Sequence, residues 1–216
     1  MNTIYAALFT SAFAQLDPRR LSGLTQMIVN QLQIQDPTKN WSFSEVASKL
    51  NQYGCYCFPK NNGELYGNRG RPVDEQDYLC RDLYKCHNCV TRFDHPGDCS
   101  FKSNYGIFNS NNELRCSVNR NTPCEKSRCE CDRNFAIKLA HLWTDTNWSF
   151  NNFYWKQKRN AKRNPTFDDT SVCVSDQSSQ FSDLDSCCGV EGQRTPFDSF
   201  KMECCNGNRL AQIGMC

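Results

Sequence analysis

The sequence predicts a mainly α-helical, disulfide-rich fold in which two long helices are cross-linked side by side, followed by a small cysteine-rich C-terminal module. The chain has 16 cysteines among 216 residues, while its mean hydropathy is only −0.70. Disulfides usually stabilise such a polar chain by about 2–4 kcal/mol each, and they persist in oxidising compartments. A cytosolic zinc protein fits less well, because only three histidines are present and no paired C-x-x-C units occur at zinc-ribbon spacing.

The first half of the chain contains two predicted helices followed by a loop. Apolar residues recur at helical spacing over 21–32, which predicts an amphipathic helix. A second, short helix is predicted to start at Ser42, where Glu45 completes a capping box. Residues 55–72 are dense in Gly, Asn and Pro, a composition typical of loops.

The two long helices are predicted next. The first covers roughly 73–90, with acidic residues in its first turn, where the helix dipole favours negative charge. Turns and a short hairpin are expected over 93–118, and the second long helix is expected over 129–143. Cys86 and Cys131 are natural partners for a disulfide between the two helices.

The N-terminal end and two sequons predict a secreted, glycosylated protein. Residues 1–14 are apolar and uncharged and end in a small-x-small motif, which is typical of a signal peptide. The sequence NWS occurs at Asn40 and again at Asn147, which predicts two glycosylation sites. No other run approaches the ~20 apolar residues that a membrane span needs.

The distribution of charge suggests a boundary near residue 165. The formal net charge is +2, and we expect no nucleic-acid partner. Residues 151–164 carry five basic residues and three aromatics without an acid, whereas the chain beyond is mostly acidic. We therefore expect a main domain over 15–165 and a tail over 166–216. The candidate anion-binding residues are Lys156, Lys158, Arg159, Lys162 and Arg163.

Three ordered motifs resemble secreted phospholipase A2. They are YGCYC at 53–57, PVDEQDYLC with its following cysteine at 72–86, and RC…C….CECDRNFAIKLA at 115–140. The resemblance covers roughly 20–165 and implies the family's disulfide-braced α fold with two antiparallel helices. The disulfides that it implies are Cys57–Cys80, Cys86–Cys131, Cys99–Cys124 and Cys116–Cys129, with Cys55 reaching a late cysteine such as Cys173.

The chain departs from this family at the residues that carry its chemistry. In the family's helix motif C-C-x-x-H-D-x-C, the general-base histidine is replaced by Leu83, which has no proton acceptor. The calcium-binding aspartate is replaced by Tyr84, a poor ligand for a hard cation. The glycine-rich calcium loop is altered after Cys57. We therefore expect no calcium cofactor and no phospholipase activity.

Two further differences suggest that the scaffold was kept. Leu79 and Lys138 stand where the resemblance implies the two ends of another disulfide, so both ends are missing together. His87 lies one turn after Leu83, where it is expected to hydrogen-bond Asp132 and relieve the burial of that carboxylate. We expect a structural role for His87 rather than a catalytic one.

The tail offers two interpretations. Its double cysteines, each followed closely by Gly, are similar to a repeat of galaxin, a skeletal-matrix protein, but a disulfide-knotted extension explains them equally well. Cys89 and the five cysteines after Cys173 form an even set, whose pairing the sequence leaves open.

Three functions follow from these observations. The first is a non-enzymatic extracellular matrix or biomineral-associated protein similar to the otoconins, with a matrix or mineral surface as partner and with self-association. The second is a cationic effector that binds anionic lipid or sulfated glycan, similar to inactive venom phospholipase homologues. A calcium-dependent phospholipase A2 is the least favoured.

Overall fold

The computed structural model describes residues 18–50, 53–57, 72–97, 105–110, 113–146, 148–150 and 184–216, with the backbone alone for 18–22, 109–110 and 150. The helices are α1 (Pro18–Gln35), α2 (Phe43–Leu50), α3 (Glu75–Cys89) and α4 (Pro123–Leu142), with short π and 3₁₀ turns at η2 (Val90–Asp94) and η3 (Trp148–Phe150). The strands are β1 (Ile107–Ser110), β2 (Glu113–Cys116), β3 (Ser186–Cys188), β4 (Thr195–Phe197), β5 (Met202–Cys205) and β6 (Arg209–Gln212). Among the described residues, none of the helices is both long and apolar enough to cross a membrane.

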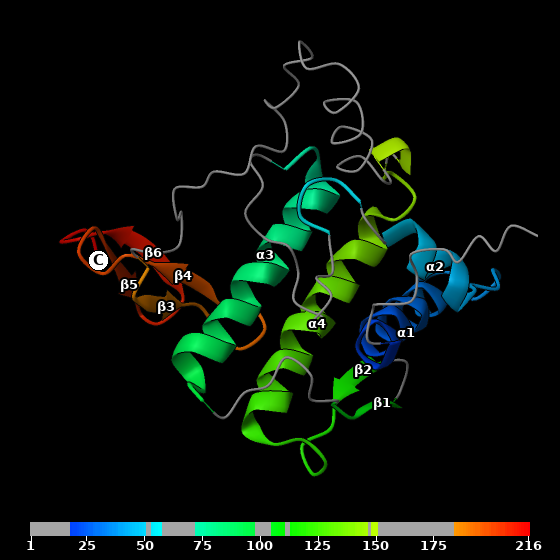
Figure 1. Ribbon diagram of the computed structural model, residues 1–216, viewed down its shortest axis with the longest axis horizontal. Helices are drawn as coiled ribbons and strands as arrows, with labels where there is room; N and C mark the ends of the chain where they lie inside the picture. The colour runs from blue at the N-terminus through cyan, green and yellow to red at the C-terminus, as the bar shows by residue number, and fades with distance from the viewer. Residues whose placement is uncertain are drawn as a thin grey trace, which may run out of the picture.

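α3 and α4 run side by side and antiparallel through the centre of the molecule (Figure 1). Cys86 and Cys131 join them by a disulfide. α1 packs against α4 on the side away from α3, and α2 packs on α1. The buried apolar side chains between these helices form one core cluster, to which Met27, Ile28 and Leu139 contribute fully buried side chains. The helical content and the disulfides agree with the predicted mainly α, disulfide-rich fold.

Capping residues decide where these helices begin. Asp74 is the N-cap of α3 and accepts a hydrogen bond from the backbone N–H of Asp77. Thr122 caps α4 in a reciprocal capping box with Glu125. The prediction that the second long helix begins at 129 was therefore wrong by six residues, because this cap and Pro123 start the helix at residue 123.

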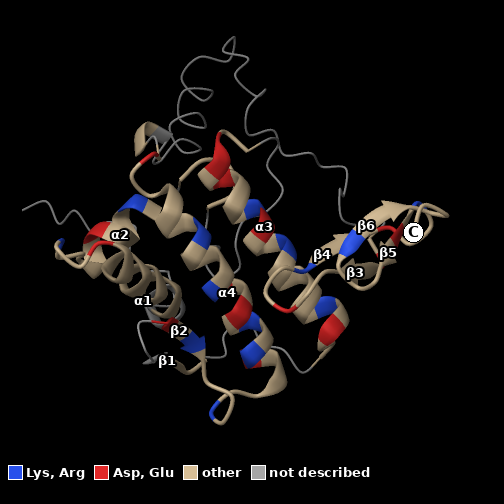
Figure 2. Cartoon of the chain, turned by 180° about the vertical axis from the view of Figure 1, so that it is seen from behind, with Lys and Arg blue, Asp and Glu red and all other residues tan. Residues whose placement is uncertain are grey.

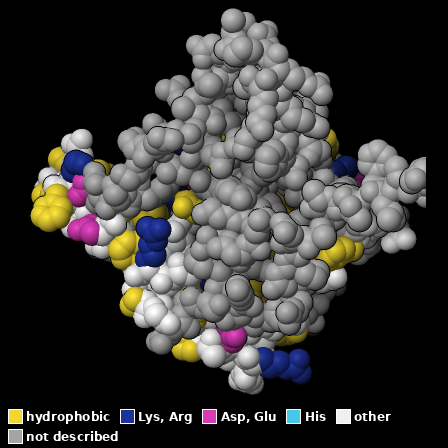
Figure 3. All heavy atoms as spheres, viewed as in Figure 1, with side chains coloured by type: hydrophobic (Ala, Val, Ile, Leu, Met, Phe, Trp, Pro, Cys, Tyr) yellow, Lys and Arg dark blue, Asp and Glu magenta, His cyan; other side chains and the backbone are white. Residues whose placement is uncertain are grey.

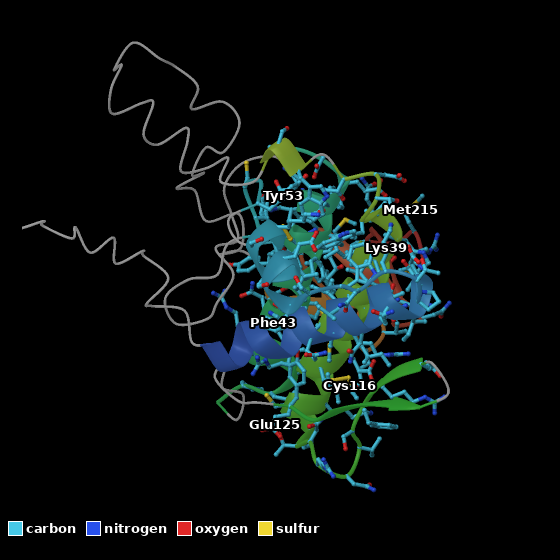
Figure 4. All side chains as sticks on the ribbon, turned by 90° about the vertical axis from the view of Figure 1, so that its right-hand side faces the viewer. Lys39, Phe43, Tyr53, Cys116, Glu125 and Met215 are labelled. Carbon is cyan, nitrogen blue, oxygen red and sulfur yellow. A yellow bond between two sulfur atoms is a disulfide. The ribbon has the colours of Figure 1, made fainter. Side chains whose placement is uncertain are left out.

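A β-hairpin lies along one side of the helical core. β1 and β2 pair antiparallel, with Ile107 opposite Cys116. Cys116 bonds to Cys129, so that the hairpin is fastened to α4, and Figure 4 shows it lying against α1 and α4. A short hairpin was expected in this part of the chain.

The C-terminal module, residues 184–216, consists of two β-hairpins placed on the far side of α3 from α1 and α2 (Figure 1). β3 pairs with β4, and β5 pairs with β6, each pair antiparallel. Three disulfides hold the module, namely Cys89–Cys187, Cys188–Cys204 and Cys205–Cys216. The first of these joins the module to the end of α3.

Noncovalent contacts also dock this module on the helices. Arg194 forms a two-pronged ion pair with Asp94, with Nη2 2.5 Å from Oδ1 and Nε 3.2 Å from Oδ2. Lys126 Nζ lies 3.2 Å from Glu191 Oε2. Gly192 has a φ of +82°, and a Cβ atom there would lie 2.8 Å from the carbonyl oxygen of Glu130. The module is therefore closely packed on α4 as well as bonded to α3.

Candidate functional site

The segment 53–57 is tied to the start of α3 by a buried carboxylate. The Asp77 side chain accepts hydrogen bonds from the backbone N–H groups of Cys55, Tyr56 and Val73 at 2.9, 2.7 and 3.0 Å. Burial raises the pKa of Asp77 to about 6, although these donors oppose the rise. Gly54 has a φ of +57°, and a Cβ atom there would lie 2.3 Å from Asp77 Cγ.

Two of the three carboxylates at the start of α3, those of Asp74 and Asp77, are engaged by hydrogen-bond donors of the chain, while Glu75 is exposed. Asp77 is fully buried and accepts the three bonds just described. Asp74 accepts from Tyr53 Oη through Oδ2 and from the backbone N–H of Asp77 through Oδ1. The sequence placed both acids near the first turn, but their long-range partners on 53–57 were not predicted from it. These two carboxylates are thus part of the scaffold.

The centre of α3 presents an apolar side chain to the core. Leu83 is only 3% exposed and belongs to the core cluster. Tyr84, the next residue, is half-buried, and its carbonyl accepts a hydrogen bond from Asn88. The Leu83 side chain can neither accept nor donate a proton, so the helix offers no base at this position.

One turn further along, His87 forms a buried cluster with α4 and with the residue just before β1. His87 Nε2 lies 2.7 Å from Asp132 Oδ1, and Tyr105 Oη donates to Asp132 Oδ2 at 2.5 Å. Burial by itself would raise the pKa of Asp132, but the charge of His87 and the hydrogen bonds from His87 and Tyr105 hold it below its usual value. The carboxylate is thereby paired on both oxygens. The sequence predicted the contact with His87 and missed the one with Tyr105.

At the one described position where the resemblance implies a calcium-binding carboxylate, the residue present does not fit a calcium ion. Calcium takes six to eight oxygen ligands, with carboxylates prominent among them. Where the resemblance implies the ligating aspartate, this chain has Tyr84, and the altered loop after Cys57 lies outside the described residues. Within the described part of the chain, Glu203, Cys205 and Cys216 form the one cluster with metal-binding atom types, but its two sulfurs are joined in a disulfide.

A cavity lies where the resemblance implies a further disulfide. Leu79 and Lys138, its two expected ends, line a hollow of about 130 Å³ between α3 and α4. Leu83 and Phe135 contribute apolar walls, and residues 192–195 of the C-terminal module close one side. The module thus lies beside the position of the disulfide that the resemblance implies.

The other predicted sites are placed only in part. The structure pairs Cys57 with Cys80, Cys86 with Cys131 and Cys116 with Cys129, as the resemblance implies. Cys55 and Cys124 are disulfide-bonded, while Cys99 and Cys173 lie outside the described residues. Asn40 is exposed between α1 and α2. Also outside the described residues are 1–14, Asn147, Lys156, Lys158, Arg159, Lys162 and Arg163.

Comparison with known proteins finds one family. The family model for phospholipase A2 matches residues 31–151. A phospholipase A2 of Bos taurus is 35% identical over 106 residues, covering 46% of this chain and 65% of that protein. A phospholipase A2 of Ovis aries is 34% identical over 106 residues, covering 46% of this chain and 76% of that protein. The human group IIF secretory phospholipase A2 is 32% identical over 98 residues, covering 41% of this chain and 48% of that protein.

Proposed function

The chain belongs to the phospholipase A2 family, and we propose that it is a secreted member without hydrolase activity that serves as an extracellular matrix or biomineral-associated binding protein. The observation that carries this proposal is the buried side chain of Leu83 at the centre of α3. Hydrolysis of an ester needs a base within about 2.6–3.2 Å of the attacking water, and a leucine side chain cannot take its proton. The scaffold therefore keeps the family's helices without the group that would activate water.

His87 does not supply the missing base. It lies one helical turn from Leu83, which displaces it by about 5–6 Å along the helix. Its Nε2 is already 2.7 Å from Asp132, and the His87 ring is buried. A base in this position would have to leave its carboxylate partner before it could reach a water molecule at the position of Leu83. The cluster supports a structural role.

A matrix or binding role draws support from the parts that the chain has kept or added. The Cys86–Cys131 disulfide between α3 and α4 is retained, and the C-terminal module extends the surface with two disulfide-held hairpins. Hydrogen bonds from Ser199 lower the pKa of Asp185, and the Lys201 side chain lowers that of Asp198. Both carboxylates are ionised at neutral pH, and a cationic or mineral surface that used Asp198 would displace Lys201 from it. The similarity of the tail to a galaxin repeat agrees with that use.

The test is calorimetry of calcium binding on the secreted, oxidised chain, with phospholipid hydrolysis assayed on the same sample. We expect neither tight calcium binding nor turnover, and we expect measurable adsorption to calcite. The bovine relative serves as the positive control for both assays. Stoichiometric calcium binding with lipid turnover would overturn the proposal, and His87 would then be the first residue to replace.

A second candidate is a cationic effector that binds anionic lipid or sulfated glycan. The sequence feature behind it is the run of five basic residues that follows three aromatics at 153–155, all outside the described residues. Salt-sensitive binding to heparin or anionic vesicles, lost when the five cations are replaced by Gln, would support this candidate. Binding that is unchanged by those substitutions would exclude it.

A further inference from the structure

We propose that copies of this chain associate head to tail, with the apolar end of the C-terminal module of one copy seated in the cavity between α3 and α4 of the next. This inference rests on the proposed matrix role, for which it supplies a means of assembly. Two surfaces of opposite charge on the same chain support it.

The first surface is the apolar end of the β5–β6 hairpin. Phe200, Ile213 and Met215 are 85%, 57% and 68% exposed. All three leave the same end of the hairpin, because Met202 pairs with Gln212. Figure 3 shows apolar side chains gathered at the outer edge of the module, next to acidic and basic ones. Exposed apolar side chains that cluster in this way are typical of an interaction site.

Acidic side chains fix the backbone that carries this apolar end. Asp198 accepts from the backbone N–H of Phe200 at 2.9 Å, and Glu203 accepts from that of Met215 at 2.9 Å. Asp185 accepts from the backbone N–H of Ser199 at 2.8 Å. Together with Lys201, these three acids give the end of the hairpin a net charge of −2. Two disulfides further limit its motion, so that binding costs it little conformational entropy.

The second surface is the cavity at the place of the missing disulfide. Its walls include the apolar side chains of Leu79, Leu83 and Phe135, and its volume is about 130 Å³. Asp82 also lines it. Burial raises the pKa of Asp82, and the charges of Lys85, Arg81 and Lys138 oppose that rise. The cations that act on Asp82 are Arg81, Lys85 and Lys138.

These charges make the surroundings of the cavity positive. Three cations around one acid give a net charge of +2, opposite to that of the hairpin end. Arg194, which also lines the cavity, is neutralised by Asp94. Figure 2 shows Lys and Arg positions, interspersed with acidic ones, along α3 and α4 beside the C-terminal module. The hollow combines the apolar side chains of its wall with polar ones such as Asn134 and Gln193. Together with its basic surround, it is complementary to the acidic, apolar hairpin end.

The charges favour a second copy of this chain over an anionic bilayer. Anionic headgroups would repel the acids around Phe200, whereas the basic residues around the cavity attract these acids. The two surfaces are different parts of one chain, so the contact is heterologous and repeats instead of closing into a two-fold dimer. Such repetition would build extended assemblies.

The test uses the full oxidised chain in analytical ultracentrifugation. We expect its mass to rise with concentration above the 24.9 kDa of one chain, and to fall towards that value as salt screens the charges. Phe200→Asp replaces the most exposed apolar side chain of the hairpin end, and Lys138→Glu reverses a charge at the cavity. Each variant alone should therefore remain a single chain. Val118→Asp and Arg120→Glu are matched controls on an exposed turn before α4 and should assemble as the parent does.

Mixing the two defective variants gives the sharpest result. Each retains the surface that the other has lost, so an equal mixture should form a two-chain complex that grows no further. A parent chain that stays single at every concentration, or a mixture that shows no complex, would overturn the inference. Assembly that persists in Phe200→Asp would do the same. Phospholipid hydrolysis by a chain that still assembles in this way would overturn the proposed function alone.

Discussion

His87 Nε2 on α3 lies 2.7 Å from Asp132 Oδ1 on α4, and both side chains are buried. The pair lies next to the Cys86–Cys131 disulfide, so the two long helices are joined there by a covalent bond and a charged contact at neighbouring positions. Because Tyr105 binds the other oxygen of Asp132, the segment just before β1 is held at the same point. The arrangement leaves both oxygens of the Asp132 carboxylate hydrogen-bonded.

Replacing His87 by Leu should destabilise the fold strongly. The substitution leaves the charge of Asp132 buried with one fewer partner, which costs about 3–5 kcal/mol in comparable cases. His87→Tyr is the matched control, because a phenol can donate to the same carboxylate, and it should cost less. Urea unfolding of the two variants measures the difference. Equal losses would show that the contact with Asp132 does not stabilise the fold.

Stability should depend on pH through Asp77. Its folded-state pKa of about 6 lies above the ordinary value of 3.8, so the folded chain binds this proton more tightly than the unfolded chain does. The contribution of Asp77 is therefore fully present below about pH 4 and is lost as the pH rises through about 6, a change of up to about 3 kcal/mol.

Asp77→Asn tests this prediction because an amide does not titrate in this range. The free energy of unfolding, followed from about pH 4 to about pH 7 by urea titration, should fall in the parent chain and change less in the variant. Parallel curves for the two proteins would assign the pH dependence to other groups.

The disulfide Cys89–Cys187 should stabilise the docked module more than the disulfide at its end does. Its sequence separation is 98 residues, against 11 for Cys205–Cys216, and a longer closed loop restricts the unfolded chain more. Removing the first with paired Ser substitutions should cost about 2–4 kcal/mol. Removing the second should cost less. Urea denaturation measures both, and hydrogen exchange at the end of α3 shows whether the module has detached.

Gly192 should tolerate alanine less well than Gly207. Both have positive φ angles, +82° and +72°, so both substitutions strain the backbone, by about 1–3 kcal/mol each. At Gly192 the new Cβ atom would also meet the Glu130 carbonyl oxygen at 2.8 Å, whereas nothing lies within 4 Å at Gly207. Gly192→Ala should therefore lower the melting temperature more than Gly207→Ala. Equal effects would show that the approach to Glu130 is not tight.

Local signals in the sequence predicted most of the helical frame. One half of the capping box predicted at Ser42 is present, because the Glu45 backbone N–H lies 3.2 Å from Ser42 Oγ. α3 begins and ends within two residues of the predicted span. α4 begins earlier than predicted, because Thr122 and Pro123 are strong start signals that lay outside the apolar pattern. Periodicity identifies the middle of a helix better than its ends.

The sequence by itself determined that α3 has Leu83 and Tyr84 in place of a base and a carboxylate, because residue identity and spacing along one helix are local facts. It also limited the pairing of Cys89 to an even set of six cysteines, but six cysteines allow fifteen pairings. Only the tertiary structure decided that Cys89 bonds to Cys187 and that the module lies beside the gap between Leu79 and Lys138. The physical reason is that these contacts join residues far apart in the chain, whose approach is set by packing of the whole core and by no short pattern.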